Sequence, residues 1–192
     1  MNEKELIERL CKNESESFQI LMDTYSQPLF TLAYSMVHQR QDAEDIVQDV
    51  FITVHKSIHQ FKAESSIRTW LYRITLNKTI NFIKRQKMNR LQIGFEQLFN
   101  VYSNDDSPSG RIELDETSLL LHKIIDKLPV RQREAFVLYH YNEHSYGEIS
   151  DIMKISNSAV ESLLFRARRL FQDNFLKLSK ETQENLFRFV KH

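Results

Sequence analysis

The sequence has few of the residues that interrupt or cross-link a chain. Its 192 residues include three glycines, three prolines and a single cysteine, Cys11. One cysteine cannot form a disulfide within the chain, and nothing else in the sequence argues for an oxidising compartment. The scarcity of glycine and proline disfavours a sheet protein with many tight turns. No apolar run approaches the ~18 residues needed to cross a membrane. We therefore expect a cytoplasmic protein built of helices.

No charge of either sign is in excess. Lysine and arginine together number 26, as do aspartate and glutamate, so the formal net charge is zero. The charges are nevertheless segregated along the chain. Residues 41–49 contain four acids and no base, whereas residues 62–90 contain eight bases and one acid. Such segregation indicates two different partners, one basic and one anionic.

Apolar residues recur at helical spacing in both halves of the chain. Between the halves, Gly94 and Gly110 bracket a segment whose second part is rich in Ser, Asn and Asp, which is typical of an interdomain linker. Pro28 and Pro129 each indicate the first turn of a helix. The predicted fold is all-α, with two small helical domains at residues 1–93 and 112–178, a flexible linker at 94–111 and a tail at 179–192.

The C-terminal half carries the pattern of a helix-turn-helix. Ser145 and Glu148 form a capping box that begins one short helix, and after a break a second helix is predicted from Asn157 to Phe175. One face of the second helix is apolar and is expected to lie in the domain core. The opposite face bears hydroxyls, arginines and one aromatic ring, which favours a helix that reads the DNA major groove. For an arbitrary amphipathic helix, a solvated polar face is the commoner explanation.

The segment LPVRQREAFVLYHYNEHSYGEISDIMKISNSAVESLLFRARRLF closely resembles region 4 of the extracytoplasmic-function (ECF) sigma factors of the sigma-70 family. The resemblance implies a four-helix, winged-helix-like domain that binds the −35 promoter element. The contacts that it implies are Ser158, Glu161, Ser162, Phe165, Arg166, Arg168 and Arg169. Two features depart from the family pattern. Lys154 stands where a turn glycine is common, and Glu161 and Leu163 stand where many members carry bases.

The acids of residues 41–49 lie at the start of a predicted helix with an apolar face. An acidic first turn stabilises any helix through its dipole, but four acids exceed that need. DAEDIVQDVF resembles region 2 of the sigma-70 family, in which this helix docks on a coiled coil of the largest polymerase subunit. The resemblance implies that core RNA polymerase is bound by Asp42, Glu44, Asp45, Asp49, Val50 and Phe51.

The next segment is predicted to form a polar loop and then a basic helix capped by Ser65 or Ser66. Its Trp, Asn and Lys side chains fall near one line of the helix and would suit single-stranded DNA, although a half-buried Trp is common in any amphipathic helix. SSIRTWLYRITLN resembles the −10 reading segment of the same family. The resemblance implies −10 contacts by Phe61, Lys62, Ser65, Ser66, Arg68, Trp70, Arg73, Asn77, Asn81 and Lys84.

Together these resemblances imply a sigma factor that binds core RNA polymerase and directs promoter-specific initiation in a stress or envelope response, with promoter DNA and an anti-sigma factor as further partners. The alternative is a helix-turn-helix regulator that is not a polymerase subunit, which leaves the acidic and basic N-terminal helices unexplained. An enzyme is disfavoured because the chain has no phosphate-binding glycine loop and Cys11 has no neighbouring histidine. His55 and His59 have metal-ligand spacing but no evident third ligand. We expect no metal, cofactor or small-molecule substrate.

Overall fold

The computed structural model describes residues 2–97 and 116–178. Most of the predicted linker and the whole tail lie outside these residues. Every regular element in the described ranges is helical, which confirms the all-α prediction. The first group of elements is α1 (Glu3–Cys11), α2 (Ser15–Val37), α3 (Arg40–Ser57), the short 3-10 helix η1 (Ile58–Gln60) and α4 (Ile67–Gln97). The second group is α5 (Glu116–Asp126), α6 (Val130–His140), α7 (Tyr146–Met153) and α8 (Asn157–Phe175).

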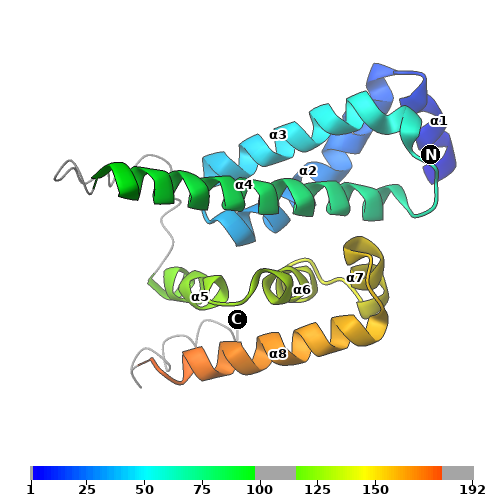
Figure 1. The fold of residues 1–192 in the computed structure, drawn as a ribbon. Helices are drawn as coiled ribbons and strands as arrows, with labels where there is room; N and C mark the ends of the chain where they lie inside the picture. Colours follow the sequence, from blue (N-terminus) through cyan, green and yellow to red (C-terminus); the bar gives the residue numbers. More distant parts are fainter. Residues whose placement is uncertain (1, 98–115, 179–192) are drawn as a thin grey trace.

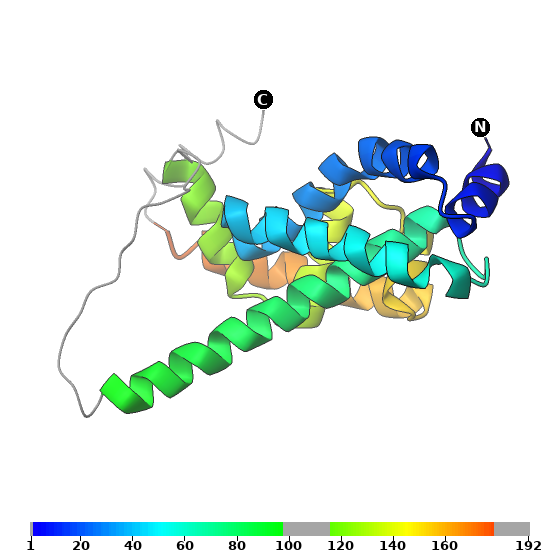
Figure 2. The same cartoon turned by 90° about the horizontal axis from the view of Figure 1, so that it is seen from above.

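The two groups form two layers. Figure 1 shows α1 to α4 on one side and α5 to α8 on the other, with the long helix α4 running along the face that the second group approaches. Figure 2 shows the last turns of α4 extending past the other helices. Among the described residues, no helix is long and apolar enough to span a membrane. The arrangement leaves one face of α3 and the outer face of α8 open.

The core of the first layer is formed where α2, α3 and α4 meet. Leu29 and Leu32 of α2, Val50 of α3 and Leu71 of α4 are fully buried there. In α3 the buried residues recur at intervals of three or four, so that the acids between them are turned outward. Apolar spacing thus decides which side chains α3 presents to a partner.

Pro28 lies inside α2 and not in the first turn of a helix, so the sequence-based placement is wrong. Proline has no N–H to donate to the carbonyl of Thr24, a loss that usually breaks a helix. Burial of Leu29 and Leu32 just after it holds the helix through this position. Tertiary packing therefore outweighs the local preference. Pro129, by contrast, stands immediately before α6 as its N-cap, close to where the sequence placed it.

The helix-turn-helix of the second layer matches its sequence-based description. The Ser145 hydroxyl accepts a hydrogen bond from the Glu148 amide, and the Glu148 carboxylate accepts one from the Ser145 amide, which completes the capping box of α7. Helix α8 begins at Asn157 and ends at Phe175, as predicted. Val160, with its neighbours on the same face, is fully buried. The opposite face of α8 is consequently exposed.

Candidate polymerase and promoter interfaces

The acidic face of α3 is only partly neutralised by its own neighbours. Glu44 pairs with Arg40 on the same helix (Nε to Oε1, 2.7 Å), and Asp49 lies 3.6 Å from the Lys78 ammonium of α4. Asp42 accepts a hydrogen bond of 3.2 Å from the side chain of Gln86. Within the described part of the chain, Asp45 has no hydrogen bond or ion pair and its side chain is exposed. Asp45 is therefore the acid with the most freedom to bind a basic partner.

The pKa of Asp42 is raised above its usual range. Burial against α4 is the main cause, and the charge of Asp45 adds to it, while the hydrogen bond from Gln86 opposes it. Two carboxylates that repel one another favour an incoming cation, because the cation relieves the repulsion as well as pairing with each charge. The negative charges on α3 therefore favour contact with a basic protein surface.

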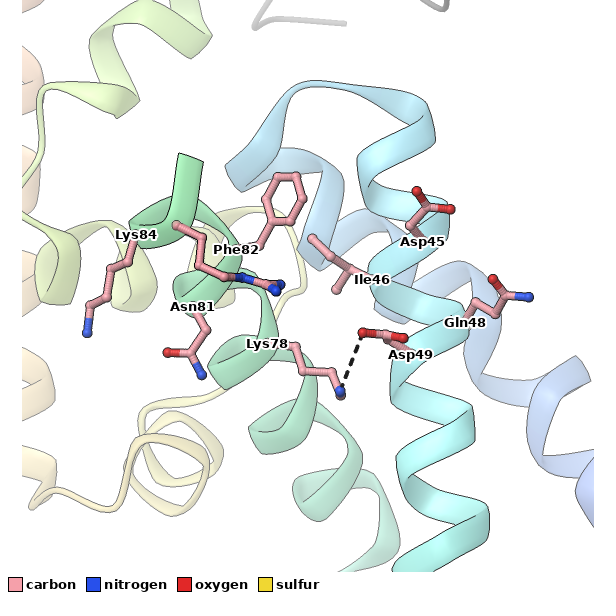
Figure 3. Close-up of a pocket in the computed structure, with 9 residues that line it drawn as sticks. Asp45, Ile46, Gln48, Asp49, Lys78, Asn81, Phe82 and Lys84 are labelled. Atoms are coloured by element: carbon pink, nitrogen blue, oxygen red, sulfur yellow. Dashed lines mark ion pairs between the residues drawn. The ribbon is translucent and has the colours of Figure 1, made fainter. Parts of the chain in front are cut away.

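A groove of about 760 Å³ lies between α3 and α4, next to these acids. In Figure 3, Asp49 faces Lys78 across the groove, Ile46 points toward Phe82, and Gln48 points away from α4. The groove therefore has an apolar floor and charged edges of both signs. Such a surface fits a protein partner that carries both charges and an apolar side chain.

Two apolar residues of the predicted polymerase set differ in access. Val50 is fully buried in the core, where it packs the helix and is out of reach of a partner. Phe51 is half-buried and lines a second groove, between α2 and α3, together with Glu44 and Asp45. We accordingly keep Phe51, and not Val50, in the candidate surface.

The loop before α4 is anchored where it joins the helix. The Ser66 hydroxyl accepts a hydrogen bond from the Thr69 amide, so Ser66 is the residue that caps α4. The amide of Ile67 donates to the carboxylate of Glu3, 64 residues earlier, at 2.6 Å. Ala63 adopts a left-handed conformation with φ of 53°, which costs a residue with a side chain roughly 1–2 kcal/mol. Lys62 and Ser66 are exposed and Ser65 is half-exposed, within reach of a DNA strand.

Along α4 the predicted −10 residues separate into two groups. Trp70 is half-buried, with its ring centroid 5.1 Å from that of Phe61, and Asn77, Asn81 and Lys84 are exposed. Arg68 and Arg73 instead contact the second layer of helices. Asn77 lies at the border of the two groups, because it is exposed but also lines a small cleft with Arg73 and residues of the second layer. The sequence placed all of these residues on one basic helix, but it gave no sign that part of that helix is covered.

The turn between α7 and α8 forms without the glycine that is common at this position in the family. Lys154 takes the left-handed conformation itself, with φ of 54° and ψ of 52°. The Ser150 hydroxyl donates to the Ile155 carbonyl, and the Ser156 hydroxyl accepts from the Ala159 amide at the start of α8. These two hydroxyls fix the angle between the helices without a glycine.

The exposed face of α8 has the chemistry of a DNA-reading helix. Phe165 is 66% exposed, an uncommon position for so large an apolar side chain. Arg166 donates to the hydroxyl and the carbonyl of Ser162, and the guanidinium of Arg168 lies 5.1 Å from the centre of the Tyr139 ring. The remaining predicted residues of this face, Ser158, Glu161 and Arg169, are also exposed.

One further residue belongs to this face and was missed by sequence reasoning. Tyr146, the first residue of α7, lines a groove of about 370 Å³ together with Ser158, Phe165 and Arg168. The groove is bordered by hydroxyls, an aromatic ring and a guanidinium. The signal in the sequence was the position of Tyr146 directly after the cap of α7, where a helix-turn-helix approaches the DNA backbone.

Metal binding has no support in the described ranges. No group of three or more His, Cys, Asp and Glu side chains there is arranged to hold a metal ion. Both His55 and His59 are exposed, and the ring of His55 packs edge-on against Phe18.

Comparison with known families covers both layers. Residues 21–88 match sigma-70 region 2, and residues 118–171 match sigma-70 region 4. The first match contains α3, the loop and most of α4, and the second contains the helix-turn-helix. Both regions implied by the sequence are therefore present, and in the order that the resemblance required.

Relatives align over nearly the whole chain. The RNA polymerase sigma-H factor of Pseudomonas aeruginosa is 27% identical over 186 residues, which cover 93% of this chain and 96% of that protein. The ECF RNA polymerase sigma factor SigW of Bacillus subtilis is 30% identical, with 86% and 92% covered. Among solved structures, CnrH in complex with the cytosolic domain of CnrY shares the fold, with a TM-score of 0.69, 22% identity, and 92% of this chain and 99% of that chain covered. This chain belongs to the extracytoplasmic-function sigma factors of the sigma-70 family.

Proposed function

We propose that this sigma factor binds core RNA polymerase through the acidic face of α3, captures the −10 strand with the loop before α4 and the exposed part of α4, and reads the −35 element with α8. The two domains that divide this work are residues 1–93 and 112–178, joined by 94–111. Each surface carries the charge that its partner requires: acids for a basic protein surface, and bases with aromatic rings for DNA. A sigma factor needs all three surfaces on one chain.

The main support for the proposal is the position of Asp45. It is exposed, it has no partner among the described residues, and it borders both grooves of α3. Burial raises the pKa of the neighbouring Asp42, and the charge of Asp45 adds to that rise. A regulator that acts without polymerase has no use for an unneutralised acidic face next to a DNA-binding helix.

The test reverses one charge. Asp45→Arg should lose capture of core RNA polymerase and run-off transcription, because attraction becomes repulsion and an opposing basic residue is left unpaired, a change that costs several kcal/mol. Folding should persist, because exposed substitutions usually change stability by less than about 0.5 kcal/mol. Pull-down of core enzyme, with circular dichroism for folding, measures both.

The matched control is Glu8→Arg, which reverses an exposed acid on α1, away from α3. It should capture polymerase as the wild type does. Equal capture by Asp45→Arg and wild type would remove α3 from the proposal. Absence of capture by the wild type itself would remove the polymerase-subunit function and revive the alternative, a regulator that binds DNA alone and as a dimer on a palindromic site.

We further propose that the protein acts in the cytoplasm, in a stress or envelope response, as a binding subunit without catalytic activity of its own. An anti-sigma factor is its expected regulator. This expectation is supported by the solved relatives, since CnrH is bound to CnrY and the sigma factor RpoE of Bartonella quintana to the anti-sigma factor NepR. Co-purification from cells before and after envelope stress would test it.

A further inference from the structure

Helix α1 lies beside the loop that is proposed to capture the −10 strand. Figures 1 and 2 both show it at the end of the first layer where the chain passes from η1 to α4. The match to sigma-70 region 2 begins at residue 21, so α1 precedes it in the chain. The three surfaces of the proposed function also leave this helix without a role.

Glu3, the first residue of α1, caps the N-terminus of α4. Its carboxylate accepts a hydrogen bond of 2.6 Å from the amide of Ile67, the first residue of α4. Because Ile67 is only 1% exposed, its amide depends on a partner within the protein. The Ser66 hydroxyl accepts from the amide of Thr69 instead. The two caps thus serve different amides in the first turn of α4, and a carboxylate there is also favoured by the helix dipole.

The other end of α1 reaches the chain just before the same loop. The Cys11 thiol lies 3.8 Å from the Ile58 carbonyl of η1, a weak hydrogen bond, and this carbonyl also accepts from the amide of Phe61 at 2.9 Å. Leu10 and Ile58 are buried in one apolar core. Since a helix rises 1.5 Å per residue, the two ends of α1 are about 12 Å apart. One short helix therefore contacts the chain on both sides of the loop.

Helix α1 is itself attached to the first layer. The Asn2 side chain accepts a hydrogen bond from the amide of Glu5, which caps α1. Near its other end, Arg9 pairs with Glu14 at 2.6 Å and with Glu16, both at the start of α2. The position of Glu3 is therefore determined by α1 and α2 and not by the loop that it contacts.

The loop and the first turn of α4 need such support. Ala63 is left-handed, with φ of 53°, a conformation that a residue with a Cβ keeps only where its surroundings hold it. The ring of Phe61, at the start of the loop, lies 5.1 Å from that of Trp70. Trp70 comes one turn after Ile67, so any movement of this first turn displaces the tryptophan ring as well.

We propose that Glu3 is a positioning residue for promoter opening. Through its hydrogen bond with Ile67 it holds the first turn of α4, the ring of Trp70 and the loop of residues 61–66 in the arrangement that receives an unpaired base. The inference rests on the proposed function for its consequence, whereas the positioning belongs to the free chain. A strand that meets an ordered site does not have to order it on binding. Loss of Glu3 should therefore impair opening and leave polymerase capture and −35 binding unchanged.

The first test follows the fluorescence of Trp70 in the free protein, because Trp70 is the only tryptophan of the chain. Glu3→Met keeps the length of the side chain and removes the acceptor oxygens, so acrylamide should quench the emission more strongly than in the wild type. Glu3→Gln keeps an acceptor oxygen and should behave as the wild type. Glu5→Met, which removes an exposed acid from the same turn of α1, is the matched control and should also do so.

These variants should fold, since Glu3 is an exposed residue, and circular dichroism checks this. Quenching in Glu3→Met equal to that in the wild type would overturn the positioning role. Stronger quenching in Glu5→Met to the same degree would also overturn it, because loss of any acid from α1 would then have the same effect.

The second test measures opening with core polymerase, by permanganate reactivity of thymines near the −10 element. Glu3→Met should lower this reactivity by about fivefold, since a hydrogen bond to a charged group changes an equilibrium by roughly a factor of ten. Glu3→Gln should restore most of it, and Glu5→Met should open the promoter normally. Capture of core enzyme and binding of a −35 duplex should stay at wild-type levels in all three variants, whereas a general loss of structure would lower them together with opening.

Normal opening by Glu3→Met would overturn the proposal, and so would equal losses in Glu3→Met and Glu3→Gln, because the charge and not the hydrogen bond would then matter. A wild type that opens no promoter with core enzyme would instead count against the proposed function. In that case the quenching of Trp70 would still decide whether Glu3 positions the loop.

Discussion

At the scale of single residues, Lys154 shows how a backbone requirement can be met by an unfavourable side chain. The turn between α7 and α8 needs a left-handed residue, and the chain supplies lysine with φ of 54°. Glycine adopts this conformation without the steric cost that a Cβ imposes. Hydroxyls at Ser150 and Ser156 hold the neighbouring backbone in place. The strain is therefore local and should be removable.

Lys154→Gly is expected to raise the free energy of unfolding by about 0.5–1 kcal/mol, because it removes that cost. Urea unfolding followed by circular dichroism measures the change. Lys154→Ala is the control, since it removes the charge and keeps the Cβ, and it should bring no such gain. Equal stabilisation by alanine would point to charge repulsion, for Arg131 lines the same small cleft.

Phe165 and Arg169 separate base reading from phosphate binding on α8, where both are exposed. Phe165→Ala should cost ~1 to 3 kcal/mol on a duplex bearing the preferred −35 element and should relax discrimination among sequences. Arg169→Ala should weaken all duplexes alike and reduce the salt dependence by about one phosphate contact. Fluorescence anisotropy at two salt concentrations, on duplexes with and without the element, distinguishes them. A uniform loss for Phe165→Ala would move that ring out of the base-reading set.

At the scale of elements, α4 carries most of the residues proposed to contact the −10 element. Its N-terminus is fixed by Ser66 and by the distant Glu3, and its first turns hold the ring of Trp70 against Phe61. The exposed amide of Asn77 follows two turns later. A rigid helix of this kind can hold an aromatic ring and an amide at a constant separation for an unpaired strand.

Trp70→Ala and Asn77→Ala should therefore impair strand opening more than polymerase capture. Permanganate reactivity of thymines near the −10 element, in complexes with core enzyme on a promoter that the wild type transcribes, measures opening. Asn89→Ala, an exposed amide on the same helix outside the proposed surface, is the control and should melt DNA normally. Wild-type reactivity in both test variants would refute the role of this face.

Helix boundaries and faces were predictable where local signals determine them. The capping box of α7, the extent of α8 and the outward acids of α3 all follow from caps and apolar spacing within a few residues. Pro28 was misplaced because the burial of Leu29 and Leu32 overrides its local preference. The hydrogen bond from Ile67 to Glu3 left no local trace, because it joins residues 64 apart.

At the scale of the whole molecule, the packing of the two layers of helices against each other was beyond sequence reasoning for the same reason. It depends on single polar contacts, such as that of Arg68 with Glu148, between residues 80 apart in the chain. No periodicity or motif encodes such a contact. The sequence predicted two helical domains, with an acidic and a basic segment in the first of them, and the packing of the two domains became visible only from the positions of the individual side chains.

Acid is expected to loosen the packing between the two layers of helices, where His122 stacks on His38 and His144 packs against Tyr72. Burial, helped by His38, lowers the pKa of His122 from its usual 6.5 to about 4, while Asp126 opposes the shift. Burial and the charge of Arg68 likewise lower the pKa of His144, against the opposing effect of Glu148. A depressed pKa of His122 costs the packed arrangement nothing above pH 6.5, and the penalty grows as the pH falls toward 4. The packing of the two layers should thus weaken across that window by on the order of 1 kcal/mol through His122, and His144 should act in the same direction.

Small-angle scattering at pH 7.5 and 5, at constant ionic strength, measures this dependence. The radius of gyration should rise at the lower pH in the wild type and rise less in His122→Gln, which keeps a polar side chain but does not titrate. His59→Gln, which changes an exposed histidine away from the second layer of helices, should behave as the wild type. An unchanged radius in the wild type would show that these rings do not govern the packing of the two layers.

The double use of α4 also limits how the sequence can change over evolutionary time. Arg68 meets a carboxylate side chain, whereas Arg73 donates to the carbonyls of the Asp151 and Ile152 backbone. If the packing of the two layers is under selection, positions 68 and 148 should covary in charge among descendants of this protein. The side chains at positions 151 and 152 can change freely as long as residue 73 keeps a long side chain that donates hydrogen bonds. The reason is that every amino acid has the same backbone carbonyl.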